Sequence, residues 1–400
     1  MPVTVFSPLL PTPAVGGNRI ALLKNGAAFF PALIAAIDAA RADIWIETYI
    51  FRDDAAGAAI AAALMAAARR GVVVRVLIDG VGSHDTPKAF FAAMQDALIE
   101  VQVFRPERQL FSLKRSRLRR VHRKLALVDG AVGFVGGINL IDDMTESLSE
   151  FPRYDYAVRI EGPVLADIYL EMTKLWRIVV RWKRGSGGAL LVPPKWLGNS
   201  QAAATGSVKI QFAVRDNFRH RRDIEKAYRA AIENAVREVL ITSPYFLPGR
   251  HFRRSLIEAT RRGVKVTLLL QGRADHALLQ QATRALYTQL LGAGIVIFEY
   301  HRSMLHGKVA VVDDMWATVG SSNLDPCSLV LNREANVVVL DRDFACAVRA
   351  SVMEEIEVNA TRQDPADWHK RGMLDRATSW LAYGFARMVA GWLGFAGRLE

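Results

Sequence analysis

Two histidines in this chain have nearly identical neighbours. Each is followed by a lysine two residues on, an aspartate seven residues on and an asparagine seventeen residues on. The first copy, within VHRKLALVDGAVGFVGGIN, contains His122, Lys124, Asp129 and Asn139; the second copy, within LHGKVAVVDDMWATVGSSN, contains His306, Lys308, Asp313 and Asn323. Chance does not account for two such matches, so the spacing indicates a duplicated protein with an active site made of two halves.

The types of these residues suit a phosphate group. Alternate residues of a β-strand face the same side, so each copy presents an imidazole and an ammonium group together. A Gly-Gly pair in the first copy and a Gly-Ser pair in the second allow a tight turn that can return the asparagine towards the histidine. Two lysines and two amides are suitable donors to the non-bridging oxygens of one phosphate. We therefore expect Asn139 and Asn323 to bind phosphate beside the lysines.

Two histidines supply what a phosphodiester exchange requires. One imidazole attacks phosphorus and forms a covalent phospho-histidine, while the other protonates the departing alkoxide. The second imidazole then removes the proton from the incoming hydroxyl group. The lysines and asparagines hold the phosphate charge, and the sequence has no carboxylate cluster suited to a metal. We therefore expect no metal and no cofactor.

Two carboxylates are candidates for orienting the histidines, because a nucleophilic imidazole needs an acceptor on its other nitrogen. Aligning YDYAVRIEG with REANVVVLD places Asp155 opposite Glu334. We expect Asp155 to hold His122 and Glu334 to hold His306, each within its own repeat. The alternative is that both carboxylates form surface salt bridges.

The aspartates of the two motifs are ambiguous. Asp129 and Asp313 belong to the repeated pattern and are counted with its catalytic residues. They lie five residues past the lysines, however, and an odd offset places them on the opposite strand face. This position favours a structural role, in which each aspartate closes a turn or pairs with a buried group.

Length and composition limit the class of protein. A chain of 400 residues exceeds one usual hydrophobic core, so two domains or lobes are expected. Hydrophobic residues make up 51% and charged residues 23%, which is typical of a globular protein and not of a disordered one. The two cysteines suggest neither a disulfide framework nor a metal cluster. A net charge of +12 favours nucleic acid or an anionic membrane leaflet as partner, or simply forms a solubilising surface.

Alternating helical and strand patterns predict an α/β fold with a mixed or largely parallel sheet covered on both faces. The segments ARRGVVVRVLIDG and TRRGVKVTLLLQG repeat at nearly the spacing of the histidine motifs, as a duplicated domain would. We expect an N-terminal arm (1–18), a first repeat (19–184), a linker rich in Gly, Pro and Ser (185–207), a second repeat (208–360) and a C-terminal segment (361–400).

The N-terminus lacks the features of a signal peptide, and no apolar run is long enough for a spanning helix. The last segment, from Met373, combines aromatic and aliphatic residues with arginines eleven residues apart on one helical face. Arg387 in its middle would cost about 2.5–3.5 kcal/mol in a spanning helix. We therefore expect an amphipathic helix at a membrane interface, or alternatively a helix docked on the protein.

The pattern H-x-K-x4-D followed by G-[GS]-x-N, present twice, resembles the phospholipase D superfamily. Within it, the segments IETYIF, DYAVRIEGP, LHGKVAVVDD, WATVGSSNLDP and NREAN are most similar to bacterial cardiolipin synthases of the B group. The resemblance implies two duplicated phospholipase D-like α-β-α lobes with one shared active site at their interface and no metal. It also implies a phospho-histidine intermediate, with His122 as nucleophile and His306 as acid.

The resemblance also implies a substrate. We expect transfer of a phosphatidyl group from one phosphatidylglycerol to another, at the cytoplasmic face of the inner membrane, by a peripheral enzyme with no specific nucleic acid partner. Two alternatives stay open: a phospholipase D-type hydrolase that uses water, and a nuclease of the same superfamily. A basic cluster fits the phosphate backbone of a nucleic acid as well as it fits lipid headgroups. Its members are Lys114, Arg115, Arg117, Arg119 and Arg120.

Overall fold

The structure is a computed structural model that describes residues 13–106, 119–144, 150–184, 204–216, 219–273, 277–325, 328, 331–370 and 372–390. Several predictions fall outside these residues. They concern most of the N-terminal arm, most of the linker, the lysine and first two arginines of the basic cluster, Cys327, and the chain beyond residue 390.

The first lobe is a mixed sheet in the order β1-β7-β6-β5-β2-β3-β4. Its strands are β1 (Val15–Lys24), β2 (Asp43–Thr48), β3 (Val73–Asp79), β4 (Glu100–Phe104), β5 (Lys124–Val128), β6 (Val132–Gly136) and β7 (Tyr156–Glu161). Its helices are α1 (Asn25–Ala39), α2 (Ala55–Arg69), α3 (Lys88–Asp96) and α4 (Leu165–Arg184). Strands β2, β3 and β4 are parallel and the others antiparallel.

The second lobe repeats this order as β8-β14-β13-β12-β9-β10-β11, with β15 added at its outer edge. Its strands are β8 (Val208–Arg215), β9 (Glu238–Ser243), β10 (Lys265–Gln271), β11 (Val296–Tyr300), β12 (Val309–Val312), β13 (Trp316–Gly320), β14 (Glu334–Leu340) and β15 (Ala360–Arg362). Its helices are α6 (Asp223–Asn234), α7 (Arg250–Arg261), α8 (Ala277–Arg284), α9 (Tyr287–Gly292), α11 (Arg342–Asn359), α12 (Pro365–Lys370) and α13 (Met373–Ala390).

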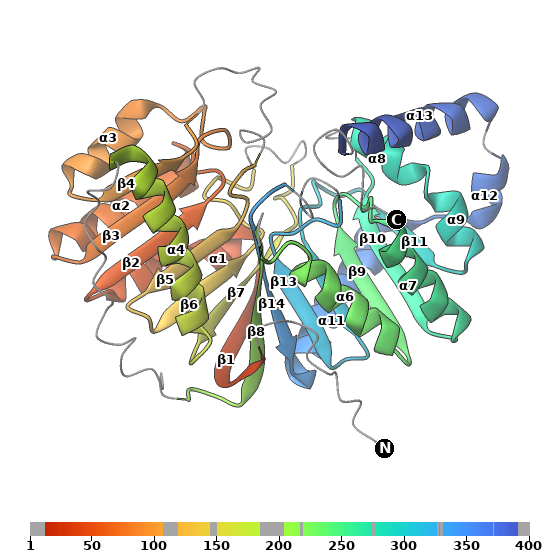
Figure 1. Cartoon of the computed structure of the whole chain (residues 1–400), viewed down its shortest axis with the longest axis horizontal. Coiled ribbons are helices and arrows are strands. Elements are labelled where there is room, and N and C mark those ends of the chain that lie inside the picture. Colours follow the sequence, from red (N-terminus) through yellow and green to blue (C-terminus); the bar gives the residue numbers. More distant parts are fainter. Residues whose placement is uncertain are drawn as a thin grey trace.

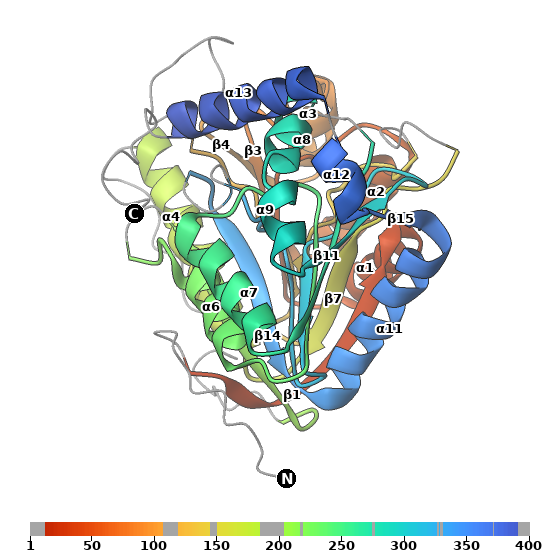
Figure 2. The ribbon, with the colours of Figure 1, turned by 90° about the vertical axis from the view of Figure 1, so that its right-hand side faces the viewer.

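The two lobes are joined by their own strands. Strand β1 pairs with β8, so the lobes share one 15-stranded sheet (Figure 1). One apolar core cluster contains residues of both lobes together with α4 and α11, which follow corresponding strands. Figure 2 shows helices on both faces of the sheet, with α4, α6 and α7 on one side and α1 and α11 on the other. The prediction of two duplicated α/β lobes is confirmed.

The helix boundaries follow from local chemistry. Helix α2 begins after Asp54, whose side chain accepts a hydrogen bond from the backbone N–H of Gly57 at 2.9 Å. Its end is followed by Gly71 at φ 91°, and α7 is followed by Gly263 at φ 87°, a conformation that glycine adopts without strain. These turns lead into β3 and β10, whose buried positions are filled mostly by aliphatic residues.

The strand directions place both motifs at one edge of the sheet. Parallel strands carry their carboxyl ends to the same edge, where α/β proteins bind ligands. Strand β5 runs antiparallel to β2, so its first residue, Lys124, lies beside the carboxyl end of β2. Strand β12 starts beside the carboxyl end of β9 in the same way, with Val309 opposite Thr242. The motif residues that precede β12 therefore lie at the matching edge of the second lobe.

Candidate active site

Each histidine is fixed by the backbone of the other lobe. The backbone N–H of His122 donates to the carbonyl oxygen of Arg333 at 2.9 Å, and that of His306 donates to the carbonyl oxygen of Tyr154 at 2.8 Å. An isolated parallel bridge one residue before each histidine reinforces these contacts. The two motif segments therefore cross the interface between the lobes.

Because of this crossing, each histidine is held by a carboxylate of the other lobe. Nδ1 of His122 lies 3.1 Å from Oε2 of Glu334, and Nδ1 of His306 lies 2.5 Å from Oδ2 of Asp155. The expected pairing within each repeat, Asp155 with His122 and Glu334 with His306, is therefore wrong. The reason is local: Glu334 and Asp155 directly follow the residues that receive the histidine N–H groups. Sequence symmetry permits either pairing, and only the interface between the lobes decides between them.

The contacts at Nδ1 define what the other ring nitrogen can do. A carboxylate oxygen is an acceptor, so Nδ1 of each ring carries the hydrogen and Nε2 keeps its lone pair. Burial lowers the pKa of His122 below its usual value, against the opposing charge of Glu334. Burial also lowers the pKa of His306, and the Lys308 ammonium adds to this effect. Both imidazoles are therefore neutral near pH 7 in the free protein.

The two motif lysines are buried beside the histidines. Nζ of Lys124 donates to the carbonyl oxygen of His122 at 2.6 Å, and Nζ of Lys308 donates to the carbonyl oxygen of His306. Burial lowers the pKa of Lys124 to about 7 and that of Lys308 to about 8. Two buried cations of this kind favour an anionic ligand, because its charge would restore their protonation.

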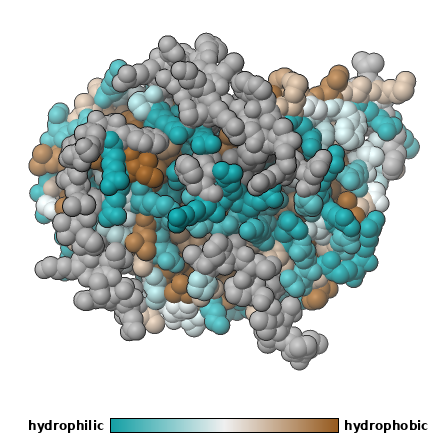
Figure 3. Space-filling view, in the orientation of Figure 1, coloured by the Kyte–Doolittle hydropathy of each residue, from teal (hydrophilic) through white to brown (hydrophobic). Residues whose placement is uncertain are grey.

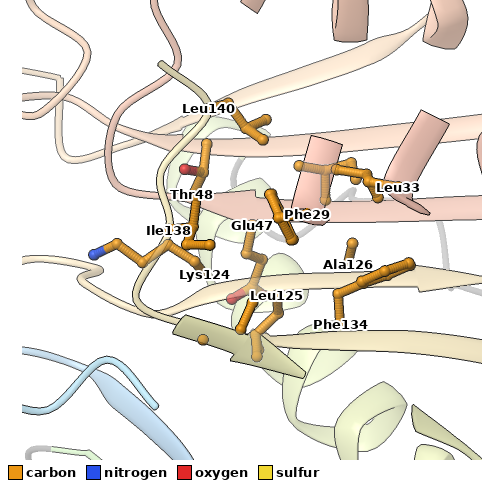
Figure 4. A pocket seen from close by; sticks show the side chains of 13 residues that line it. Phe29, Leu33, Glu47, Thr48, Lys124, Leu125, Ala126, Phe134, Ile138 and Leu140 are labelled. Carbon is orange, nitrogen blue, oxygen red and sulfur yellow. The ribbon is translucent and has the colours of Figure 1, made fainter. Parts of the chain in front are cut away.

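A small cavity in the first lobe lies next to Lys124. Its lining comes from α1, β2, β5, β6, β7 and the segment after β6, and is mostly apolar. Figure 4 shows the amine of Lys124 pointing away from the side chains of Phe29 and Leu33. Neither motif histidine lines this cavity, so it is a packing space of the core and not the substrate site.

The motif asparagines lie at the same edge as the lysines. Isolated bridges join the residues after them, Leu140 and Leu324, to the segments that follow β2 and β9. Oδ1 of Asn139 accepts the backbone N–H of Ile50 at 3.2 Å. Oδ1 of Asn323 is buried and has no hydrogen-bond partner among the residues described. The turns therefore return both asparagines to this edge, and their binding of phosphate stays a prediction.

The motif aspartates lie at the opposite ends of their strands. The carboxylate of Asp129 accepts the backbone N–H groups of residues 41–43 at 2.8–2.9 Å. That of Asp313 accepts those of residues 236–238 at 2.8 Å. Both aspartates have positive φ, 52° and 54°, as turn residues. Asp129 and Asp313 therefore close turns, as their odd offset indicates, and a catalytic role for them stays a prediction.

The two half-sites differ in the carboxylate itself and in the residue beside it. Oγ of Ser321 donates to Oε2 of Glu334 at 2.5 Å. Gly137 occupies the equivalent position of the first lobe, and a β-carbon added there would overlap Oδ1 of Asp155. Burial alone would raise the pKa of Glu334, but the charges of His122 and Lys124 and the Ser321 hydroxyl outweigh it and lower the pKa. Burial raises the pKa of Asp155 to about 6. Glu334 is thus the more firmly ionised of the two carboxylates.

Further residues surround the histidines that the sequence patterns did not single out for the site. The Tyr49 ring meets the His122 ring edge-on with centroids 5.0 Å apart, and Nζ of Lys124 lies 5.4 Å from the Tyr49 centroid. Arg153 is buried, and its charge contributes, after burial and Lys308, to the lowered pKa of His306. Tyr49 follows a buried strand in IETYIF, which is the one sequence signal that could have found it. Within the described ranges, no group of three His, Cys, Asp or Glu side chains could hold a metal ion.

Comparison with known proteins gives consistent matches. The family described as "Cardiolipin synthase, PLD-like domain" matches residues 33–176 and 228–356. Cardiolipin synthase B of Shigella flexneri is 39% identical over 383 residues, covering 94% of this chain and 90% of the relative. Cardiolipin synthase A of Pseudomonas putida KT2440 is 34% identical over 371 residues, covering 90% and 73%. Phosphatidylserine synthase of Haemophilus influenzae Rd KW20 has the same fold, with a TM-score of 0.68, 15% identity and 96% of each chain covered.

Proposed function

The chain belongs to the family of cardiolipin synthases with phospholipase D-like domains, and we propose that it transfers a phosphatidyl group from one phosphatidylglycerol to a second, releasing glycerol. It is a phosphatidyltransferase. The observation that supports this chemistry is that each histidine is held by a carboxylate of the other lobe. Both imidazoles are held at Nδ1 in this way, so that both Nε2 atoms are available to one phosphodiester.

The first half-reaction forms a phospho-histidine. Nε2 of one imidazole attacks phosphorus, an N–P bond forms, and the bond from phosphorus to the glycerol headgroup oxygen breaks. The other imidazole, protonated, gives its proton to that oxygen. The anionic phosphodiester makes this possible, because its charge offsets the two lysines and favours the protonated imidazole. Lys124, Lys308, Asn139 and Asn323 stabilise the charge on the non-bridging oxygens.

The second half-reaction transfers the phosphatidyl group. The imidazole that gave up its proton now removes one from a hydroxyl group of the second phosphatidylglycerol. That oxygen attacks phosphorus, the N–P bond breaks, and cardiolipin leaves. Water in place of the second lipid would give phosphatidic acid, so exclusion of water decides between synthase and hydrolase.

We assign His122 as the nucleophile and His306 as the acid and base. Glu334, kept ionised with the help of Ser321, accepts the Nδ1 hydrogen of His122 and increases the electron density at Nε2. Burial raises the pKa of Asp155 to about 6, so this less firmly ionised carboxylate stabilises a protonated His306 less than Glu334 stabilises His122, and His306 gives up its proton more readily. The difference between the two half-sites thus supports two different roles.

We further propose that the enzyme works as a peripheral protein on the cytoplasmic face of the inner membrane. A phosphatidyl donor is a bilayer lipid, so the catalytic edge must reach a membrane surface. No helix in the described parts of the chain has the length and apolar character needed to cross a bilayer.

The test is product analysis with labelled phosphatidylglycerol in mixed micelles, with products separated by mass. Cardiolipin and glycerol in equal amounts are the expected products. Phosphatidic acid alone would show a hydrolase and overturn the synthase. His122→Ala and His306→Ala should each abolish turnover, whereas His84→Ala, at an exposed surface position, should not change it. Cleavage of single-stranded or duplex DNA in place of lipid turnover would favour the nuclease.

A further inference from the structure

The C-terminal helix α13 is docked on the second lobe by one face only. Ser379 and Ala382 are buried, and Oγ of Ser379 donates to Oε1 of Gln281 on α8 at 3.0 Å. Figure 2 shows α13 lying across the end of α8 at the rim of the molecule. The helix is therefore a fixed part of the lobe and holds its opposite face in a defined direction.

That opposite face exposes large apolar side chains. Residues three, four, seven or eight positions apart share a helical face, and the exposed apolar residues of α13 follow this spacing. They are Met373 at 87% exposed, Trp380 at 55%, Leu381 at 73%, Phe385 at 49% and Met388 at 63%. Figure 3 shows apolar side chains along the upper right rim, where α13 lies in Figure 1. A soluble surface does not usually gather five such residues on one helix.

Positive charges border this apolar face. Arg376 and Arg387 are eleven residues apart, so both lie along one side of the apolar sector. The guanidinium group of Arg253 lies 5.9 Å from the ring centroid of Tyr383, which places the N-terminal turns of α7 beside α13. The exposed Arg254 belongs to the same turns. An apolar face with a basic border complements a bilayer that carries anionic headgroups.

The apolar face also lies at the catalytic edge of the sheet. Helices α7 and α8 begin where β9 and β10 end, at the carboxyl edge of these strands. His306 and Lys308 precede β12, whose first residue, Val309, pairs with Thr242 near the end of β9. A surface that meets the apolar face of α13 is thus on the same edge as the half-site of the second lobe.

We propose that α13 is a membrane-docking helix, which lies in the interface of an anionic phospholipid bilayer and presents the catalytic edge to the lipid headgroups. This proposal rests on the proposed function, since a lipid substrate gives the docking its purpose. The apolar residues enter the boundary between headgroups and acyl chains, and the bordering arginines meet the phosphates. The helix does not span the bilayer, and its docked face stays on α8.

The test compares two double variants of the full-length protein in co-sedimentation with vesicles of phosphatidylglycerol and phosphatidylcholine. Leu381→Glu with Phe385→Glu places two charges on the apolar face. Val73→Glu with Val236→Glu places two charges at exposed positions on the opposite edge of the sheet, next to the amino ends of β3 and β9. The first variant should lose vesicle partitioning by about tenfold or more, because two apolar contacts are removed. The second should bind as the wild type does.

A second measurement separates this proposal from the proposed function. With short-chain phosphatidylglycerol below its micelle concentration, the α13 variant should turn over at the wild-type rate, which also shows that it is folded. With vesicles it should be slow. Unchanged vesicle binding would overturn the docking helix even if cardiolipin is made. Vesicle binding that depends on α13 without any cardiolipin product would instead overturn only the synthase.

Sedimentation velocity without lipid tests whether a second copy of this chain covers the apolar face of α13 instead of a bilayer. A wild-type dimer that the α13 variant converts to monomer, with vesicle binding unchanged, would assign the apolar face to self-association and contradict the proposal. A monomer in both cases supports it.

Arg376→Gln with Arg387→Gln should weaken binding to phosphatidylglycerol vesicles but not to phosphatidylcholine alone, because only the electrostatic attraction is lost.

Discussion

At the scale of single residues, the two half-sites are alike in composition and different in chemistry. Asp155 is short, so its carboxylate lies against the backbone, and only glycine fits at position 137. Glu334 is one methylene longer and leaves room for Ser321, which adds a hydrogen bond to the carboxylate. The residue at position 137 or 321 thus depends on the length of the carboxylate side chain beside it: Gly137 goes with Asp155, and Ser321 goes with Glu334. They give one histidine an ionised partner and the other a partner that titrates near pH 6.

Removal of the Ser321 hydroxyl should slow formation of the phospho-enzyme. Ser321→Ala raises the pKa of Glu334, which weakens its hold on the Nδ1 hydrogen of His122. A hydrogen bond to a charged group contributes about 1.5–3 kcal/mol, so a loss of tenfold or more in that step is expected. Rapid-quench detection of the phospho-enzyme measures the step directly. Ser322→Ala, next along the chain, is the control, and an equal effect of both variants would contradict the role of Ser321.

The activity should have a bell-shaped pH profile with limbs set by the buried charges. Burial lowers the pKa of Lys124 to about 7 and of Lys308 to about 8, so kcat/KM should fall as the pH rises through this range and the ammonium groups lose their protons. Burial raises the pKa of Asp155 to about 6, so kcat/KM should also fall below that pH, where the protonated carboxyl group no longer accepts from His306.

The arginine variant tests the assignment of the alkaline limb. Arginine keeps its charge at all accessible pH values, so Lys124→Arg should move this limb upward even if the rate at its maximum drops. A limb that stays in place would show that another group controls it. The acid limb should be unchanged in this variant, because Asp155 is intact.

At the scale of elements, each motif is a strand with different tasks at its two ends. The end next to the carboxyl end of β2 or β9 carries the lysine, which is the first residue of β5 and directly precedes β12. The far end carries the aspartate that binds three backbone N–H groups. The odd offset of five residues from lysine to aspartate indicates this division. The fixed spacing of the motif therefore reflects the length of one strand as well as its chemistry.

Loss of the turn carboxylate should affect stability more than catalysis. Asp129→Ala leaves the N–H groups of residues 41–43 without their acceptor, and these groups are partly accessible to water. We expect a decrease of about 2 kcal/mol in the free energy of unfolding, measured with urea, and kcat/KM of the folded protein within a few-fold of wild type. Asp96→Ala, at an exposed position of α3, should change neither quantity. A folded Asp129 variant without activity would restore a direct role for this residue.

At the scale of the whole molecule, the lobes are halves of one catalyst. Strand β1 pairs with β8, a common core includes residues of both lobes with α4 and α11, and each histidine depends on the other lobe for its carboxylate. Both halves of the site belong to one chain. The protein therefore does not need a second copy to complete its chemistry.

Mixing of inactive variants tests this independence. His122→Ala and His306→Ala proteins, mixed or co-expressed, should remain inactive together, because each chain keeps one defective half-site. Assay of labelled cardiolipin formation gives the result, and a mixture of wild type with either variant controls for inhibition by the partner. Recovery of activity in the mixture of variants would show that lobes are exchanged between chains.

The sequence by itself determined the duplication and the α/β class, and it predicted the chemistry of the repeated residues and the candidate carboxylates. These properties depend on residue types at short separations, where strand periodicity and turn residues limit the geometry. The resemblance carried by the same motifs indicated the family. The alternating patterns also indicated the order of helices and strands, and the amphipathic C-terminal helix was recognisable from its spacing of apolar residues and arginines.

Only the tertiary structure decided which carboxylate holds which histidine, because sequence symmetry permits both pairings and the choice depends on contacts between residues far apart in the chain. It also decided how the C-terminal helix is placed. The sequence offered a membrane helix or a docked helix as alternatives, and α13 packs one face on α8 while its apolar face stays exposed. Both answers depend on which surfaces meet when the chain folds, and no local pattern carries that information.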